Sequence, residues 1–257
     1  MSVIALASAK GSPGVTTTAL ALAAVWPRRV LVAECDPAGG DLACWFGLPA
    51  APGLVTLGPT ARRGLRPADV WAHSQIVSDA LEVLPGFVRP DQAAAVMQLW
   101  QELPAAFAAL DADVLADCGR LATASPVLPL LRAADVVVVL ARPNTGGVAH
   151  LEPWLGTLTR AGVNAKVALL GDRPYRAADV AAALGERGAA TEVIGVVADD
   201  RDAARRLAGA SGSDRMLARS LLIRSARLLA DAIGTRLALV ADPHARRHKE
   251  VLRDARG

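Results

Sequence analysis

Seven short apolar runs, separated by alanine-rich segments, constrain the fold of this chain more than any other feature of its sequence. The runs are nearly continuous instead of alternating with polar residues, which is typical of parallel strands buried on both faces. The predicted strands are Val3–Ala7, Val30–Ala33, Leu81–Leu84, Val114–Ala116, Val136–Leu140, Val167–Leu170 and Val193–Val197. The predicted helices between them are Thr16–Val25, Gln92–Gln101, Val148–Arg160, Ala177–Leu184 and Met216–Ile233.

This alternation of strands and helices predicts an α/β fold. We expect a doubly wound, mostly parallel sheet with helices on both faces and right-handed crossovers. Ligands bind such sheets at the carboxyl ends of the strands. One domain is expected over residues 1–240, followed by a basic, flexible tail over residues 241–257. Proline and glycine cluster in residues 47–67, which predicts a surface loop there.

The composition excludes several classes of protein. Hydrophobic residues make up 53% of the 257 positions, so the chain is too apolar to be disordered and long enough to bury a sizeable core. Its three scattered cysteines form no disulfide framework, which indicates a reducing compartment, and we expect a cytoplasmic protein. No apolar run reaches the ~18 residues of a transmembrane helix, and no basic segment precedes the first run. Neither membrane insertion nor a signal peptide is expected.

Lysine is scarce in this chain, with 3 Lys against 25 Arg and a net charge of only +3. The 54 alanines and the many arginines are typical of a GC-rich genome. A given arginine is therefore weak evidence for an anionic partner, whereas each lysine is informative.

The segment after the first predicted strand has the pattern of a phosphate-binding loop. It reads AKGSPGVTTTALALA, which is a turn containing glycine followed by threonines that open a helix. Backbone N–H groups of such a turn point at an anion, and the helix dipole favours negative charge there. The candidate nucleotide-binding residues are Lys10, Gly11, Ser12, Pro13, Gly14, Val15, Thr16 and Thr17. An ordinary turn between a strand and an alanine-rich helix is the alternative.

The loop resembles the deviant Walker A motif of the MinD/ParA family, K-G-G-x-G-K-[ST]. Lys10 matches the signature lysine of that family, Gly11 and Gly14 match its glycines, and Ser12 replaces the middle one. The resemblance continues through VLVAECDPAGGDL, where the family has D-x-D-P, and through DVLADCGRL, where a strand ends like a Walker B motif. ADVVVVLARPNTGGVAHL, GDRPY and EVIGVVADD follow in the order of the family, over about 230 residues.

The resemblance implies a role for each matching residue. Thr16 would bind Mg²⁺ and Thr17 the α-phosphate, while Asp117 would hold a metal-bound water. Asp36 resembles the residue that positions the attacking water, and with Thr16 and Asp117 it completes the implied metal site. Lys10 resembles the lysine that reaches the partner's nucleotide in family dimers, where added charge stabilises phosphoryl transfer. Lys10 and Asp36 are therefore the candidate catalytic residues. The alternative roles are a turn residue for Asp36 and a strand-end carboxylate for Asp117.

Val15 is the main departure from the family pattern, because it occupies the position of the second lysine, which normally binds the β- and γ-phosphates. Loss of such a charge-assisted contact costs on the order of 1.5–3 kcal/mol of binding. We therefore expect weak nucleotide affinity and slow or absent hydrolysis. Lys10, from its own chain or from a partner, is the expected compensating charge.

Asp172, in GDRPY, stands where family members often place an asparagine that contacts adenine. An ionised carboxylate accepts hydrogen bonds but donates none, so it suits the N–H groups of guanine better than the acceptors of adenine. The alternative is a loop aspartate paired with Arg173 or Arg176. ATP is the expected nucleotide, with Mg²⁺, and the choice of base is open.

Three functions follow from the resemblance. The first is a MinD/ParA-like ATPase, a nucleotide-gated homodimer that binds a protein partner in chromosome partitioning or in positioning a septum, secretion or pilus machinery. The second is a nucleotide-binding pseudo-ATPase scaffold without turnover, and the third is a metabolic ligase or synthase on the same fold. Nonspecific DNA binding is open, with a solvated basic face as the alternative. The candidate basic residues are Arg205, Arg206, Arg215, Arg219, Arg224 and Arg227.

Overall fold

The computed structural model describes residues 1–11, 14–79, 81–189, 191–209 and 215–241. A single eight-stranded sheet runs through this part of the chain in the order β3-β4-β2-β5-β1-β6-β7-β8. Every neighbouring pair is parallel except β3 and β4, which are antiparallel at one edge. The strands are β1 (Val3–Ser8), β2 (Val30–Glu34), β3 (Gln75–Ser78), β4 (Leu81–Leu84), β5 (Asp113–Arg120), β6 (Val136–Ala141), β7 (Ala165–Leu170) and β8 (Val193–Val197).

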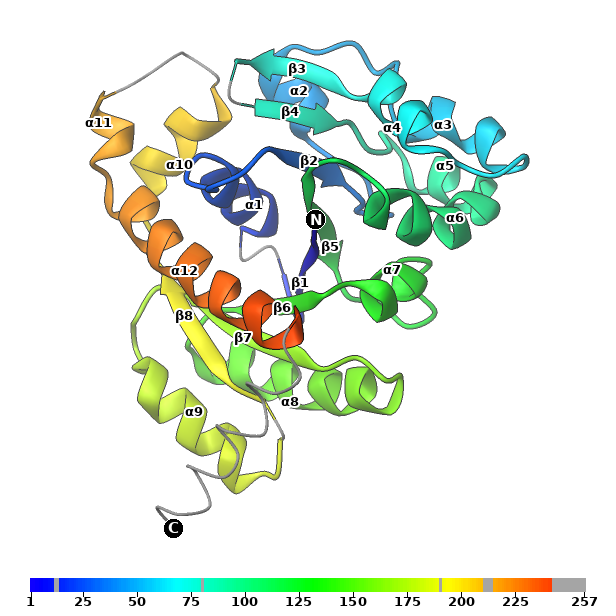
Figure 1. Ribbon diagram of the computed structural model, residues 1–257. Helices are drawn as coiled ribbons and strands as arrows, with labels where there is room; N and C mark the ends of the chain where they lie inside the picture. The colour runs from blue at the N-terminus through cyan, green and yellow to red at the C-terminus, as the bar shows by residue number, and fades with distance from the viewer. Residues whose placement is uncertain (12–13, 80, 190, 210–214, 242–257) are drawn as a thin grey trace.

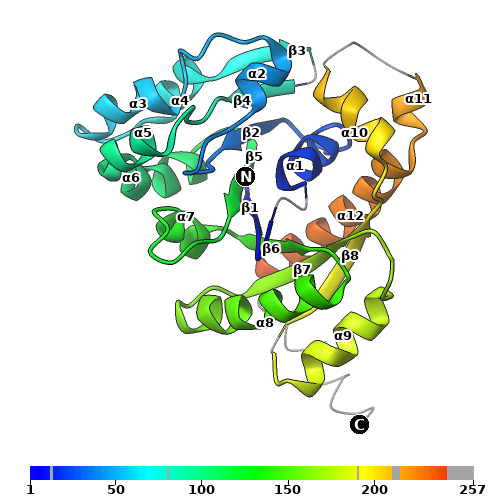
Figure 2. The same ribbon diagram turned by 180° about the vertical axis from the view of Figure 1, so that it is seen from behind.

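Helices cover both faces of the sheet, as Figures 1 and 2 show from opposite sides. One face is covered by α1 (Val15–Ala23), α2 (Leu42–Phe46), α10 (Arg201–Ala208) and α12 (Leu221–Ala241), with α11 (Arg215–Ala218) just before α12. The opposite face is covered by α3 (Leu54–Ala61), α4 (Pro67–His73), α5 (Pro90–Ala95), α6 (Met97–Ala108), α7 (Leu128–Ala133), α8 (Thr145–Arg160) and α9 (Ala177–Glu186). The predicted doubly wound α/β fold is confirmed.

The apolar runs are continuous because each strand buries side chains on both faces. In β1, Ile4 and Leu6 pack under α1 and α12, while Ala5 and Ala7 pack on the opposite face. All six residues of β1 are buried. A half-exposed strand would need polar residues at every second position, so the sequence pattern follows directly from the two-sided core.

Asp113 fixes the amino ends of the central strands. Its buried carboxylate accepts hydrogen bonds from the backbone N–H of Ser2, from Trp26 Nε1 and from Arg28 Nε, each at 2.8 Å. The first of these lies next to β1, and the other two lie in the segment that leads into β2. These contacts join the first residue of β5 to the segments that lead into β1 and β2.

The seven predicted strands are confirmed, and one more is present. The additional strand, β3, has alternating half-buried and exposed residues and pairs antiparallel at the edge, so it lacks the continuous apolar run on which the prediction was based. The predicted helix over 92–101 is two helices, α5 and α6, which meet at Val96. The predicted helix over 216–233 is likewise divided into α11 and α12, before Leu221.

The predicted surface loop over 47–67 is wrong in its middle part. Helix α3 forms there and buries Leu54, Leu57 and Ala61 against the core. These residues have the spacing of one helix face, which outweighs the local proline and glycine content. Gly58 is also buried, and a Cβ there would lie 2.4 Å from Val96 Cγ1, so close helix packing accounts for this glycine.

We predict that Trp100→Ala lowers the free energy of unfolding by about 3–5 kcal/mol. Trp100 is fully buried on α6, lies 5.5 Å from Phe87 between ring centroids, and donates from Nε1 to the Ala93 carbonyl at 3.1 Å. Urea unfolding followed by circular dichroism measures the change. Leu228→Ala, at a side chain 71% exposed on α12, is the control and should change stability by less than about 0.5 kcal/mol. Equal stability of the two variants would contradict the packing described here.

Candidate functional site

The predicted phosphate loop joins β1 to α1 and places the start of α1 at the carboxyl edge of the sheet. Gly11 and Gly14 have φ values of +67° and +80°, and Gly14 is the N-cap of α1. The Gly14 carbonyl accepts from the Thr18 N–H at 2.9 Å, which begins the helix. The N–H groups of this first turn lack intrahelical partners and favour an anion. Ser12 and Pro13 lie outside the described residues.

Thr16 and Asp117 make the central contact of the site. Thr16 Oγ1 donates to Asp117 Oδ2 at 2.5 Å, and the Gly119 N–H donates to Asp117 Oδ1 at 3.0 Å. Burial, reinforced by the carboxylates of Glu34 and Asp36, raises the pKa of Asp117 to about 7 in spite of these hydrogen bonds. A hydroxyl and a carboxylate side by side are oxygen ligands that suit a hard divalent cation.

Asp36 lies beside Asp117 because β2 and β5 are neighbours in the sheet, with Glu34 in register with Asp117. The Ala38 N–H donates to Asp36 Oδ1 at 2.8 Å, so Asp36 also has the turn role. Its carboxylate is packed against Gly119, where a Cβ would lie 1.9 Å from Asp36 Oδ2. Burial raises the pKa of Asp36. The structure therefore brings together Thr16, Asp36 and Asp117, the three residues predicted as a metal site.

Glu34 has a structural role that the sequence did not indicate. Its carboxylate accepts backbone N–H groups from Asp41 at 2.7 Å, Leu42 at 2.8 Å and Gly86 at 2.9 Å. Burial raises the pKa of Glu34, and these three hydrogen bonds oppose that shift. A Cβ on Gly40 would lie 1.9 Å from Glu34 Cδ. Glu34 thus holds the loop after β2 against the segment after β4, and this fixes one wall of the site.

These segments enclose a cavity of about 360 Å³ at the carboxyl ends of β1, β2 and β5. Four acidic side chains face it, and Arg120 is its one basic side chain among the described residues. The lining residues are Ser8, Gly11, Gly14, Val15, Thr16, Thr17, Glu34, Asp36, Gly39, Gly40, Asp41, Trp45, Asp117, Gly119 and Arg120. An anion in this cavity needs a cation to offset the acidic wall.

Val15 and Lys10 occupy different surroundings. Val15 is 5% exposed, belongs to the apolar cluster around α1, and also lines the 360 Å³ cavity. Lys10 is exposed and lines a neighbouring cavity of about 260 Å³ at the start of α8, with Arg142, Asn144 and three glycines. Its Nζ lies 3.6 Å from the position that a Cβ on Gly146 would take. The acidic cavity therefore receives no lysine from the described part of its own chain.

Asp172 lies in a third cavity, of about 1270 Å³, between the segments that follow β7 and β8 and the start of α12. Its carboxylate is exposed and lies 4.0 Å from Arg173 Nε. This is the pairing with Arg173 that the sequence left open as the alternative to base recognition. Asp199, on the same cavity, is paired with Arg142 at 2.8 Å.

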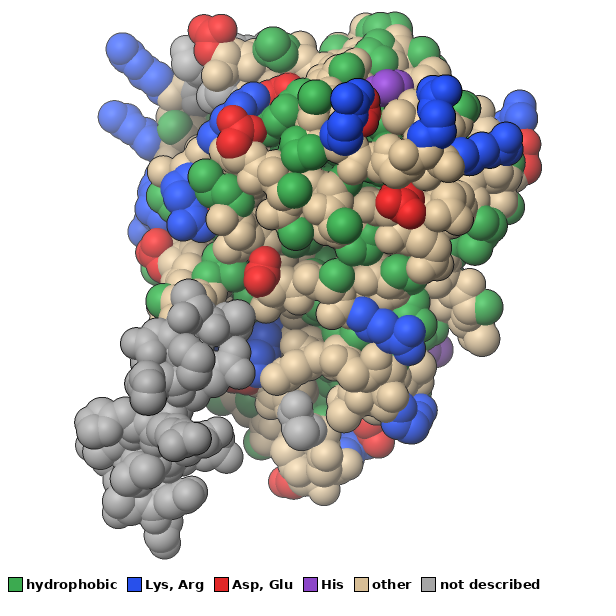
Figure 3. All heavy atoms as spheres, turned by 45° about the vertical axis from the view of Figure 1, so that its right-hand side comes forward, with side chains coloured by type: hydrophobic (Ala, Val, Ile, Leu, Met, Phe, Trp, Pro, Cys, Tyr) green, Lys and Arg blue, Asp and Glu red, His purple; other side chains and the backbone are tan. Residues whose placement is uncertain are grey.

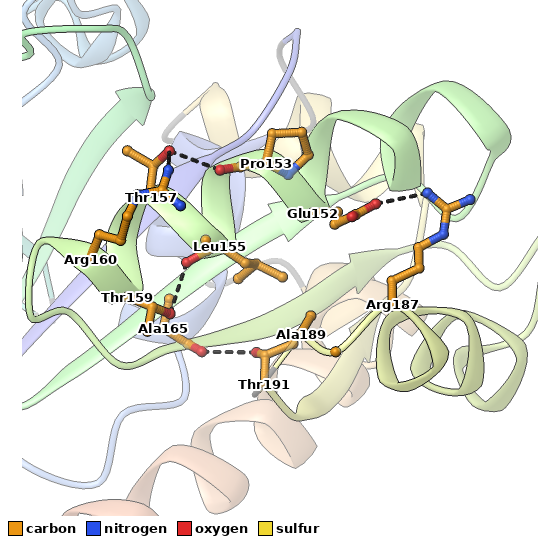
Figure 4. A pocket seen from close by; sticks show the side chains of 12 residues that line it. Glu152, Pro153, Leu155, Thr157, Thr159, Arg160, Ala165, Arg187, Ala189 and Thr191 are labelled. Carbon is orange, nitrogen blue, oxygen red and sulfur yellow. Dashed lines mark hydrogen bonds and ion pairs between the residues drawn. The ribbon is translucent and has the colours of Figure 1, made fainter.

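A further cavity of about 520 Å³ lies between α8 and the segment after α9, shown in Figure 4. An ion pair between Arg187 and Glu152, at 2.7 Å, stands on one side of it. Thr157 and Thr159 donate to carbonyls of their own helix, and Thr191 donates to the carbonyl of Ala165. Ala165 opens β7, so this cavity is at the amino end of that strand, away from the edge where such sheets bind ligands.

The predicted basic residues of α10 to α12 are all exposed: Arg205, Arg206, Arg215, Arg219, Arg224 and Arg227. On the face in Figure 3, basic and acidic side chains are interspersed and do not form a patch of one sign. Within the described residues, no helix combines the length and apolar character needed to cross a membrane. DNA binding stays a prediction.

The architecture is similar to that of MinD and ParA proteins of known structure. A ParA family ATPase from Chlorobium tepidum TLS superimposes with a TM-score of 0.73 and 16% identity, over 90% of this chain and 97% of that one. The septum site-determining protein MinD from Pyrococcus horikoshii OT3, complexed with Mg-ADP, gives 0.68 and 16%, over 90% and 95%. A Cyanothece McdA variant in complex with ATP gives 0.62 and 18%, over 93% and 96%.

No family model matches the sequence, and a search of curated proteins finds no match either. At these levels of identity the similarity to solved structures is one of fold. The site residues of this chain must therefore be judged from their own geometry.

Several residues of the site were missed from the sequence, among them Glu34 as an acceptor of backbone N–H groups, Gly119 and Arg120. The role of Glu34 could not be recognised from the sequence, because the N–H groups that it binds lie seven, eight and 52 positions away. The sequence does contain one indication of Gly119 and Arg120. A glycine directly after Asp117 and Cys118 indicates a change of backbone direction near the end of the strand.

We predict that Gly119→Ala lowers the free energy of unfolding by more than the ~1–2 kcal/mol of a left-handed alanine. Its φ is +59°, and the added Cβ would also collide with the Asp36 carboxylate. Gly47→Ala is the matched control, because its φ is +61° and no atom lies within 4 Å of the added Cβ. Urea unfolding compares the two. The collision argument is wrong if both variants lose the same stability, or if Asp36→Ala in the Gly119→Ala background restores none of it.

Proposed function

We propose that this chain is a MinD/ParA-like protein that binds Mg²⁺ and ATP and dimerises when ATP is bound, with weak or absent hydrolysis. The observation that carries the proposal is the contact between Thr16 and Asp117 at the start of α1. It places a hydroxyl, a buried carboxylate and the free N–H groups of a helix at one point of the carboxyl edge. That combination suits a phosphate group together with a divalent cation.

The residues fit Mg²⁺ when phosphate oxygens share it. No three His, Cys, Asp or Glu side chains of the described residues form a metal-binding group by themselves. Mg²⁺ commonly takes one or two protein oxygens and completes its coordination with waters and substrate phosphates. Thr16 and Asp117 would hold it, with Asp36 nearby. When bound, it would offset the negative charge of both the phosphates and the acidic wall.

Two solved structures of the same fold support this ligand. The MinD structure from Pyrococcus horikoshii contains Mg-ADP and the Cyanothece McdA variant contains ATP. Binding of these ligands by the present chain is part of the proposal. Adenine is the default base, because Asp172 faces Arg173 at 4.0 Å and gives guanine no specific support.

The second candidate function is a pseudo-ATPase, which binds ATP but does not hydrolyse it. The specific observation in its favour is Val15, which gives the cavity neither charge nor donor at the position where a phosphate loop has lysine. Charge stabilisation matters most in the transition state, so its loss reduces hydrolysis more than binding. A metabolic ligase or synthase on the same fold is the least supported of the three functions.

The cellular role is proposed only in outline. A dimer that binds a protein partner could position chromosomes, a septum, or a secretion or pilus assembly, and the exposed arginines of α10 to α12 leave nonspecific DNA open. We retain one nucleotide-binding domain over residues 1–240 and a cytoplasmic location as part of this proposal. Residues 242–257 of the expected tail lie outside the described residues.

We predict that the chain binds Mg·ATP and that Thr16→Ala weakens binding by about 10-fold or more, since it removes a metal ligand that also orients Asp117. Isothermal titration with Mg·ATP measures the affinity, and omission of Mg²⁺ should reduce wild type to the level of the variant. Thr157→Ala, in the cavity of Figure 4, is the control and should bind as wild type does. Absence of Mg·ATP binding by wild type would refute the proposed function.

Light scattering with ATP, with ADP and without nucleotide, together with phosphate release, separates the candidates. Dimers that form only with ATP and release no phosphate would select the pseudo-ATPase. Dimers that form with ATP and release phosphate would select the ATPase. A chain that stays monomeric under all three conditions would contradict both forms of the dimer proposal.

We predict that Val15→Lys raises the affinity for Mg·ATP by about 10-fold, because it restores a charge-assisted phosphate contact. The long lysine stem can stay against the apolar cluster around α1 while its ammonium reaches the cavity that Val15 lines. Val15→Met is the control for size without charge. The prediction fails if the lysine and methionine variants bind Mg·ATP equally while both remain folded by circular dichroism.

A further inference from the structure

We propose that Arg120 supplies, from within the same chain, the phosphate-binding cation that Val15 does not. This assignment rests on the proposed nucleotide binding and names the residue that makes it possible in an acidic cavity. Arg120 would bind the phosphates beyond the α-phosphate, where the second lysine of a phosphate loop acts.

The backbone of Arg120 is fixed beside the phosphate loop. Arg120 is the last residue of β5 and stands in register with Ser8, the last residue of β1. The Leu121 N–H donates to the Ser8 carbonyl at 2.9 Å. Ser8 Oγ lies 3.4 Å from the carbonyl oxygens of both Gly11 and Gly119. One serine thus connects the start of the phosphate loop to the residue before Arg120.

Gly119 explains why Arg120 reaches the cavity. Side chains alternate along a regular strand, so Arg120 would share the face of Cys118, which is fully buried in the core under α6 and α7. Gly119 has φ +59°, which interrupts that alternation. Arg120 instead lines the same cavity as Asp117, together with Thr16. The close packing of Asp36 on Gly119 keeps a larger residue out of this position.

Arg120 matters because it is the one positive charge, among the described residues, in a cavity lined mainly by acidic side chains. Glu34, Asp36, Asp41 and Asp117 line the cavity, and Arg120 alone opposes them among the described lining residues. The Arg120 side chain is exposed and makes no hydrogen bond or ion pair with any described residue, so its guanidinium is available to a ligand. A guanidinium binds phosphate through two parallel hydrogen bonds and stays charged at any physiological pH.

The other nearby cations are less suitable. Lys10 lines the adjacent cavity at the start of α8, and Arg142 is already paired with Asp199 at 2.8 Å. Both would have to leave their present surroundings to reach the acidic cavity.

The test is a titration series with Mg·ATP, Mg·ADP and AMP on wild type and variants. Arg120→Ala should weaken Mg·ATP binding by about 10- to 100-fold and leave AMP binding within about 2-fold, because AMP lacks the phosphates that Arg120 contacts. Arg120→Lys should retain most of the affinity. Arg63→Ala, at an exposed arginine after α3 that lines no cavity described above, is the matched control and should bind as wild type.

A double-mutant cycle with Val15→Lys makes the test specific. If Arg120 replaces the missing lysine, Arg120→Ala should cost less than about 3-fold in the Val15→Lys background, since the two cations serve the same phosphates. Equal losses in both backgrounds, or equal weakening of AMP and Mg·ATP, would overturn the assignment. Wild-type affinity in Arg120→Ala would also overturn it while leaving the proposed function intact. Only a wild-type protein that binds no nucleotide would refute both the Arg120 assignment and the proposed function.

Discussion

The hydrogen bond between Thr16 and Asp117 joins segments 101 residues apart, and the organisation of the site depends on it. It exists because β1 and β5 are neighbours, with Leu6 in register with Asp117, so that α1 starts directly over the end of β5. Burial disfavours the ionised form of the Asp117 carboxyl and raises its pKa to about 7. A divalent cation at this point would offset the effect of burial, because it favours the ionised carboxylate.

The carboxylates around this contact are kept apart by backbone geometry more than by countercharges. Glu34 is satisfied by three N–H groups, and Asp36 by the N–H of Ala38 and by its position against Gly119. Hydrogen bonds from N–H groups offset the negative charge of a carboxylate only in part, so the cavity keeps a negative electrostatic potential. An acidic cavity of this kind disfavours a bare anion, so in the proposed function the nucleotide would bind together with a cation. The acidic wall would then make the proposed metal and nucleotide binding interdependent.

The sequence predicted the parts of the molecule that rest on regular burial. Seven strands were identifiable because two-sided burial leaves a continuous apolar run, and Asp36 and Asp117 were identifiable from the resemblance of the segments that end two of these runs to D-x-D-P and Walker B motifs. Helix α3 was missed because its apolar spacing is hidden among prolines and glycines, and β3 because an edge strand needs no such run. The positions of Gly119 and Arg120 depend on one positive φ and one close contact with Asp36, and neither leaves a periodic pattern.

The source of the missing charge determines how nucleotide binding relates to dimerisation. If Lys10 of a second chain were the required cation, the site would be complete only in the dimer, and apparent affinity would rise with protein concentration. Arg120 belongs to the same chain and to the same strand as Asp117, so it completes the site of a monomer. Under this proposal nucleotide binding would come first, and dimerisation would be a separate equilibrium that binding can shift. Lys10, which is exposed and lines the cavity at the start of α8, would then be left for dimerisation. In this proposal the two cations have separate roles: Arg120 would hold the phosphates, and Lys10, one of only three lysines, would act in association.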